Sequence, residues 1–170
     1  MMKYGLKLRG VFRMFLLLLM VGCAKDENGR GGGTLALRFH HLVDGSPLVT
    51  DEIRYENGAG NAYGVSEIQW FISDLTLHRS DGSRMVLDTG AFAHYVDTDL
   101  PDTHVWQIGQ DIPPGAYDAI SITFGIKGEK NKPYMYTDSP ESEMIWPINL
   151  GGEQGGYHYM KLNGFWISDE

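Results

Sequence analysis

Apolar and polar residues alternate along most of this chain, with the period of two that a β-strand imposes. The first such segment runs from Thr34 to Val43. Its more apolar face, which we expect to be buried, is formed by Leu35, Leu37, Phe39, His41 and Val43. This alternation points His41 inward and His40 outward.

The longest expected strand covers Val65–Arg79 and carries apolar residues on both faces. One parity holds Ile68, Trp70 and Ile72, and the other holds Phe71, Leu75 and Leu77. A strand that is apolar on both sides is typical of the centre of a fold. The Ser80-Asp-Gly-Ser83 turn then predicts a hairpin that returns through Met85–Leu87.

Further short strands are expected at Ala91–Val96, at Tyr117–Gly125 and around Tyr157–Leu162. Gly, Pro and Asp-Gly pairs separate them, and no segment shows a sustained helical period with caps. The pattern therefore predicts an all-β protein, an antiparallel β-sandwich of the immunoglobulin-like or Greek-key type.

A Gly-rich turn links Trp146 to the strand that carries His158. Paired glycines at 151–152 and 155–156 permit backbone angles that other residues resist, so this turn can bring the two side chains together. One interpretation is a hairpin whose aromatic residues fill a core. The other is that Trp146 and His158 border a ligand or metal site.

The N-terminus has the features of a lipoprotein export signal. Basic residues precede the apolar run Met14–Val21, which is too short to span a bilayer, and the run ends at Val-Gly-Cys23. We expect a signal peptide at 1–22, a flexible linker at 23–33 and one domain at 34–170. A lipid such as palmitate on Cys23, the only cysteine, would anchor the protein to the outer membrane of the cell envelope. The segment Ala24–Glu27 resembles the acidic export tags of Bacteroidetes surface lipoproteins.

Charge limits the choice of partner. The whole chain carries a net charge of −8, and residues 23–170 hold 10 basic and 22 acidic residues, a net charge of −12. A polyanion is disfavoured by such a surface, so we expect no nucleic acid partner.

The acidic loop Asp97–Asp102 could hold calcium, but its spacing matches no full calcium loop, and a solvated loop is the simpler interpretation.

No catalytic motif stands out, and the protein is not expected to be an enzyme. The chain has no G-x-S-x-G elbow, P-loop, strand-linked G-x-G-x-x-G or H-E-x-x-H sequence. The histidines remain, and by parity the three that point inward are His41, His94 and His158. Imidazoles from separate strands suit copper or zinc, and the thioether of Met160 would favour copper(I).

Several separated motifs together resemble the MbnP-like proteins, exported proteins and lipoproteins named for the methanobactin-operon member. They are Leu37-x-Phe39-x-His41-x-Val43-x-Gly45, Tyr55-x-Asn57, Ile68-Gln-Trp-Phe-Ile-Ser73-Asp-Leu-x-Leu77, His94-Tyr-Val-Asp97, Ile112-x-Pro-Gly115-x-Tyr117, Met144-x-Trp146 and Gly156-Tyr157-x-Tyr159-x-Lys161-Leu162-x-Gly164. Their order along nearly the whole mature chain carries the resemblance.

The resemblance implies a β-rich domain associated with copper. In some members a di-haem enzyme of the MauG/cytochrome c peroxidase type oxidises a tryptophan to kynurenine, which then binds copper together with histidines. Carried over to this chain, the metal ligands would be His41, His94 and His158, with Trp146 as the modified or site-lining residue. Family domains normally continue past the Lys-Leu-x-Gly strand, so this chain is expected to lack the C-terminal part of the domain.

Two functions follow as hypotheses. The first is a lipid-anchored, non-catalytic envelope protein that binds copper or another metal through histidines. The second is a surface lipoprotein without a metal that binds a partner through an aromatic contact surface. The residues expected to form that surface are Trp106, Tyr134, Tyr136 and Trp146.

Overall fold

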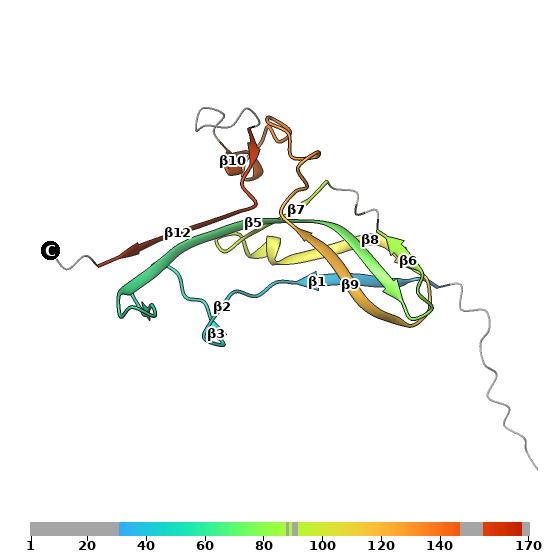
Figure 1. Ribbon diagram of the computed structural model, residues 1–170, viewed down its shortest axis with the longest axis horizontal. Helices are drawn as coiled ribbons and strands as arrows, with labels where there is room; N and C mark the ends of the chain where they lie inside the picture. The colour runs from blue at the N-terminus through green and yellow to red at the C-terminus, as the bar shows by residue number, and fades with distance from the viewer. Residues whose placement is uncertain (1–30, 88, 90–91, 147–154, 168–170) are drawn as a thin grey trace, which may run out of the picture.

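The computed structural model describes residues 31–87, 89, 92–146 and 155–167, and these residues form an all-β fold (Figure 1). Its strands are β1 (Gly33–Arg38), β2 (Leu42–Val43), β3 (Ser46–Pro47), β4 (Tyr55–Glu56), β5 (Ala62–Arg79), β6 (Arg84–Val86), β7 (His94–Asp97), β8 (Val105–Ile112), β9 (Tyr117–Phe124), β10 (Ile145–Trp146), β11 (Gly156–Tyr157) and β12 (Met160–Trp166). Two 3-10 turns, η1 (Pro101–His104) and η2 (Glu141–Met144), complete the described chain.

Every strand ladder is antiparallel, which confirms the predicted all-β, antiparallel fold class. Within the part of the chain that the structure describes, the one parallel contact is an isolated bridge between Thr50 and Val65. Among the described residues there is no helix of the length and apolarity that crossing a membrane requires.

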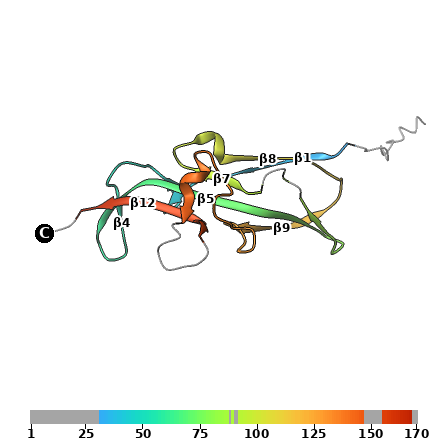
Figure 2. The same ribbon diagram turned by 90° about the horizontal axis from the view of Figure 1, so that it is seen from above.

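Strand β5 is the centre of the fold, as its two apolar faces predicted. It pairs with β4, β6, β7, β9 and β12. Strands β12 and β9 follow one another along one edge, since the Phe71 N–H donates to the Tyr159 carbonyl (3.0 Å) and the Phe71 carbonyl accepts from the Gly125 N–H (2.7 Å). Seen from above, the other strands flank this long strand (Figure 2).

A β-bulge in β5 changes which residues share a face. Ser73 pairs with Thr123 and Thr76 with Ser121, so β5 holds one residue more than β9 between these pairs. Asp74 lies within this interval with a φ of 51°. Ile72 and Leu75 therefore belong to the same core cluster, although strict alternation places them on opposite faces. The single parity predicted for this strand is wrong beyond Ser73 for this reason.

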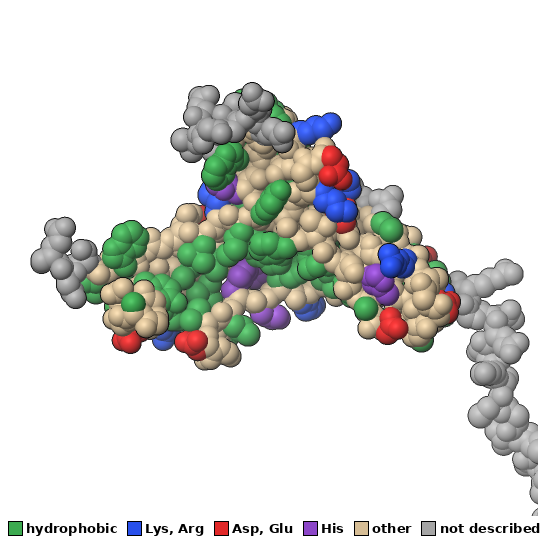
Figure 3. Space-filling model, viewed as in Figure 1, with side chains coloured by type: hydrophobic (Ala, Val, Ile, Leu, Met, Phe, Trp, Pro, Cys, Tyr) green, Lys and Arg blue, Asp and Glu red, His purple; other side chains and the backbone are tan. Residues whose placement is uncertain are grey.

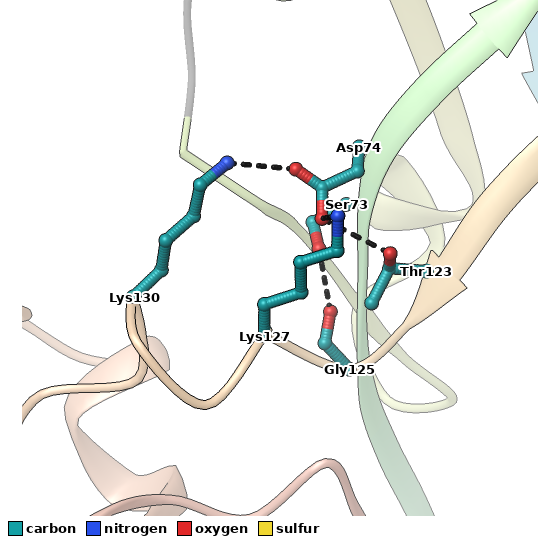
Figure 4. A network of polar contacts seen from close by, with 6 residues as sticks. All are labelled: Ser73, Asp74, Thr123, Gly125, Lys127 and Lys130. Atoms are coloured by element: carbon teal, nitrogen blue, oxygen red, sulfur yellow. Dashed lines mark hydrogen bonds and ion pairs between the residues drawn. The ribbon is translucent and has the colours of Figure 1, made fainter.

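The bulge is held by a polar network around Asp74 (Figure 4). Its carboxylate accepts hydrogen bonds from Lys130 Nζ (2.8 Å) and Thr123 Oγ1 (3.0 Å), and Lys127 Nζ lies at 3.5 Å. The hydrogen bond from Lys130 is the main cause that lowers the pKa of Asp74. The connection after β9, which looks mobile from its composition, is thus tied to the central strand.

Two apolar cores lie on opposite faces of β5. The first is covered by the two-stranded sheet β1–β8 and contains Ile72, Leu75, Leu77, Leu87, Trp106 and Ile108. The second is covered by the segments around η2, β10 and β11 and contains Phe71, Tyr95, Ile126, Met144 and Tyr157. Figure 1 shows β1 below β5 and β10 above it. The arrangement is sandwich-like, with β5 contributing side chains to both cores.

The β1–β8 sheet covers only part of the first face. Apolar side chains of the neighbouring strands β9 and β12 stay exposed, and Figure 3 shows green surface over this side of the molecule. They include Ile120, Ile122, Phe124, Met160 and Leu162, which are 39–58% exposed. This uncovered area is called the β9–β12 apolar surface below.

Candidate functional site

The pairing of β1 with β8 brings His41 and His104 together. Arg38 pairs with Val105, and the Phe39 N–H donates to the His104 carbonyl (2.9 Å), so the residues that follow β1 lie beside the end of η1. The two imidazole centroids are 5.5 Å apart. The rings line a cleft of about 250 Å³ whose other walls come from Phe39, His40, Leu42, Pro47, Leu48, Thr50 and Thr98. We call this the His41–His104 cleft.

Hydrogen bonds fix the protonation pattern of both rings. His104 Nε2 lies 2.8 Å from the Asp97 carbonyl oxygen, which can only accept, so Nε2 carries the proton and Nδ1 keeps a free lone pair. His41 Nε2 accepts a hydrogen bond from the Trp70 indole Nε1–H (3.0 Å). In neutral His41 the proton is therefore on Nδ1, and the lone pair of Nε2 points at the indole.

The cleft favours neutral imidazole. Burial lowers the pKa of His41, and the positive charge that His104 would carry lowers it further. Neutral histidine is the form that ligates metals, since a bound proton occupies the same lone pair. Near neutral pH, a metal entering the cleft would compete with an indole hydrogen bond at His41 and meet a free lone pair at His104.

His94 lies on the same side of β5, next to the cleft. Its ring stacks on Trp106 at a centroid distance of 5.2 Å and lies 5.9 Å from Phe39. His94 Nε2 donates to the Thr103 carbonyl (2.7 Å), so Nδ1 holds the free lone pair. Burial lowers the pKa of this half-buried histidine.

Trp146 and His158 form a separate site over the other core. Trp146 pairs with Gly156 in the β10–β11 ladder, and the Trp146 and His158 rings meet edge to face at 4.5 Å. They line a cleft of about 300 Å³ together with Asn131, Gly155, Tyr157 and Tyr159. Burial lowers the pKa of His158. The turn between 147 and 154 lies outside the described residues.

The expected convergence of His41, His94 and His158 on one ion is not found. The first two lie on the β1–β8 side of β5, and His158 belongs to the segment that covers Tyr157 and the opposite core. Among the described residues, three or more ligating side chains come within 4.8 Å of one another at only one place, which is Glu67, Asp97 and Asp99. Metal binding by each of the three histidines stays a prediction.

The expected set of inward-pointing histidines does not include His104, which the structure places in the cleft. The signal that could have found it is the alternation of Trp106 and Ile108 with polar residues directly after it, because that alternation marks β8. Pairing of β8 with the first strand then places His104 opposite the residues that follow β1. Cys23 lies outside the described residues, so its lipidation stays a prediction as well.

Comparison with known proteins identifies the family. The model of the family described as MbnP matches residues 32–170, well over half of the chain. A search of curated proteins and a search of solved structures each found no match. The match confirms the resemblance seen in the separated motifs, and the chain belongs to the MbnP family, which is associated with copper and methanobactin.

Proposed function

We propose that this protein binds copper as a non-catalytic, lipid-anchored component of the cell envelope, with the His41–His104 cleft as its metal site. The observation that carries the proposal is the pair of imidazoles 5.5 Å apart that line this cleft, in one of which a backbone hydrogen bond at Nε2 leaves the lone pair on Nδ1. A ligating histidine commonly donates its other N–H to a carbonyl, which is what His104 does with Asp97.

The chemistry of the donor set suits copper. Imidazole nitrogen is a good ligand for copper and zinc, and membership of the MbnP family favours copper over zinc. His94 is the nearest further candidate, since its free Nδ1 belongs to a ring that contacts Phe39 at the wall of the cleft. The Trp146–His158 pair is proposed as a second, weaker site, because it offers one imidazole and an aromatic wall.

Oxidation of a tryptophan by a di-haem partner enzyme is part of this proposal. Three tryptophans contact a histidine: Trp146 lies against His158, Trp70 donates to His41, and Trp106 stacks on His94. Trp146 is 43% exposed and therefore accessible to a partner protein, whereas Trp70 is half-buried and Trp106 is buried. Mass spectrometry of protein isolated from its native host would detect kynurenine and assign it to one of the three.

The test is a copper titration of the detergent-solubilised full chain against a competing chelator. We expect the His41→Ala, His104→Ala double variant to lose at least tenfold in affinity. His78→Ala is the matched control, because His78 bonds Ser121 far from the cleft and its removal should leave binding unchanged. Equal affinity of the double variant and the unaltered protein would remove the proposal.

The alternative is a metal-free interaction lipoprotein, and the structure alters its contact surface. Trp106 is buried in the first core, and Tyr136 stacks on Phe71 at 5.5 Å, so these two do not form the expected aromatic surface. Tyr134 and Trp146 are exposed. The β9–β12 apolar surface is the larger candidate, and it becomes the leading one if the double histidine variant binds copper normally.

A further inference from the structure

Strand β9 has one open edge. Among the described strands it pairs with β5 alone, and it lies alongside β5 in Figure 2. The Gly125 N–H donates to the Phe71 carbonyl, and alternate residues of an antiparallel strand bond to the same neighbour. The backbone groups of Ile120, Ile122 and Phe124 therefore point away from β5, and no backbone group of the described chain bonds to them there.

The side chains of these three residues form an exposed apolar row. Ile120 and Phe124 pair with Leu77 and Ile72, two members of the first core, so the row lies on the face of β5 that carries this core. Ile120, Ile122 and Phe124 are 48%, 47% and 53% exposed. Folded proteins normally protect an open edge with lysine, proline or a bulge in the edge strand. Beyond the register shift near its start, β9 has none of these.

An apolar groove lies beside the same strand. It has a volume of about 770 Å³, and its walls come from β1, from the turn that follows β8 and from the first half of β9. Leu35, Ile112 and Tyr117 line it together with Ile120. Directly opposed residues of paired strands share a face, so a strand added outside β9 would bring a side chain beside Ile120, at this groove.

The open edge, the apolar row and the groove fit one occupant, and we propose that two copies of this protein form a dimer through antiparallel pairing of their β9 strands. In a two-fold dimer of this kind the same strand supplies both sides of the interface. Asp118 is the only charged residue of β9 and lies outside the apolar row, so the pairing brings no like charges directly together. No residue that lines the His41–His104 cleft belongs to β9, so the inference does not depend on the proposed copper site.

The register of the dimer follows from the outward-pointing residues. These residues must pair with one another, and a two-fold axis beside Ile122 gives each of them an apolar partner. Ile122 then lies opposite Ile122 of the second copy, and Ile120 lies opposite Phe124. The three pairs exchange about six backbone hydrogen bonds. On the other face Ser121 lies opposite Thr123, a combination of small hydroxyl side chains that suits cross-strand pairing.

The experiment is sedimentation equilibrium of the detergent-solubilised full chain, at a solvent density that matches the detergent. Because one strand pair buries less than the roughly 1,200 Å² of stable interfaces, we expect a reversible dimer with a dissociation constant of about 1–100 μM. Ile122→Lys should weaken the dimer at least tenfold, because the two-fold axis places both ammonium groups against each other. Val86→Lys is the matched control, since Val86 is 71% exposed on β6 at the other edge of β5, and it should change nothing.

A cysteine variant tests the register. Ile122→Cys should form a disulfide-linked dimer under a mild oxidant, because directly opposed residues of this type have Cα atoms about 5.5 Å apart, within the span of a disulfide. Ile120→Cys is the control of equal exposure: its two copies would be four residues apart, about 13 Å, which is too far for a disulfide. Peptide mapping by mass spectrometry separates these links from any at Cys23.

Three results would overturn the proposal. The first is a chain that stays monomeric up to about 1 mM, well above the range of a weak specific interface, and it would leave the edge of β9 to a strand from a different protein. The second is a dimer that Ile122→Lys does not weaken. The third is a disulfide that forms as readily in Ile120→Cys as in Ile122→Cys.

Discussion

Trp70→Phe is expected to strengthen copper binding while it weakens the fold. The indole N–H donates to His41 Nε2 at 3.0 Å, and that lone pair is the one a metal would need. Binding at the other nitrogen would force a proton onto Nε2, directly opposite the indole N–H. Copper must therefore displace this hydrogen bond, and phenylalanine removes it without removing the aromatic contact with Phe39.

The size of the effect follows from the energy of one hydrogen bond. A net contribution of about 0.5–1.5 kcal/mol corresponds to a gain in copper affinity of roughly twofold to tenfold. Stability should change in the opposite direction, because Trp70 also stacks on Phe124 at 5.4 Å. The loss should stay below the roughly 3–5 kcal/mol typical of truncating a buried aromatic residue to alanine.

The assay is a chelator-competition titration at constant pH, paired with urea unfolding of the same preparations. Trp166→Phe is the control, since Trp166 is 73% exposed and lies at the far end of β12. Higher affinity together with lower stability in Trp70→Phe alone supports the reasoning. An unchanged or lower affinity would refute it, because the indole would then be orienting His41 rather than competing for its lone pair.

Three further predictions concern pH, packing and anchoring. Burial lowers the pKa of His41, His94 and His158 in the folded state, so their contribution to stability is present above the unfolded pKa of about 6.5 and is lost as pH falls through the lower folded pKa values. Urea unfolding at pH 7.5 and 5 should show a lower free energy of unfolding at pH 5. Copper affinity should also be lower at pH 5. Phe71→Ala should cost about 3–5 kcal/mol in the free energy of unfolding, because this fully buried ring contacts three tyrosines, and a loss under 1 kcal/mol would contradict the described core. Cys23→Ser should move the protein from the membrane to the soluble fraction, and an unchanged distribution would exclude the lipid anchor.

Local alternation predicted the central strand and the buried face of the first one, but it missed β8, and the expected first strand Thr34–Val43 ends at Arg38 in β1. Leu35, Leu37 and Phe39 are half-buried, while the residues between them are exposed, as the period of two requires. Alternation failed at Asp74, since a bulge depends on which strand lies alongside, and a single sequence does not show strand pairing. The pairing of β1 with β8 was hidden in the same way, and with it the closeness of His41 and His104.

The separation of His158 from His41 has a similar physical origin. The alternation of residues along a strand predicts which face of that strand a side chain occupies. It does not predict on which side of β5 the strand itself lies. His41 lies beside Trp70 on the side of the first core, and His158 lies next to Tyr157 over the second, because β5 is lined by apolar residues on both sides. The family motifs were recognisable without this information, since they depend on local sequence and order alone.

The position of β5 has a consequence for how the chain folds. The partners along one edge of β5 arrive late: Asn163 in β12 bonds to Glu67, 96 residues before it, and Gly125, directly after β9, accepts a hydrogen bond from Ser73, 52 residues before it. Such a large sequence separation between paired residues slows folding, because the entropy of closing the long loop is lost before the strand pairing can stabilise the chain. A chain synthesised from its N-terminus can pair β5 with β4, β6 and β7 early, but the opposite edge of β5 stays open until β9 and β12 are made, and an open edge is a template for pairing with another chain.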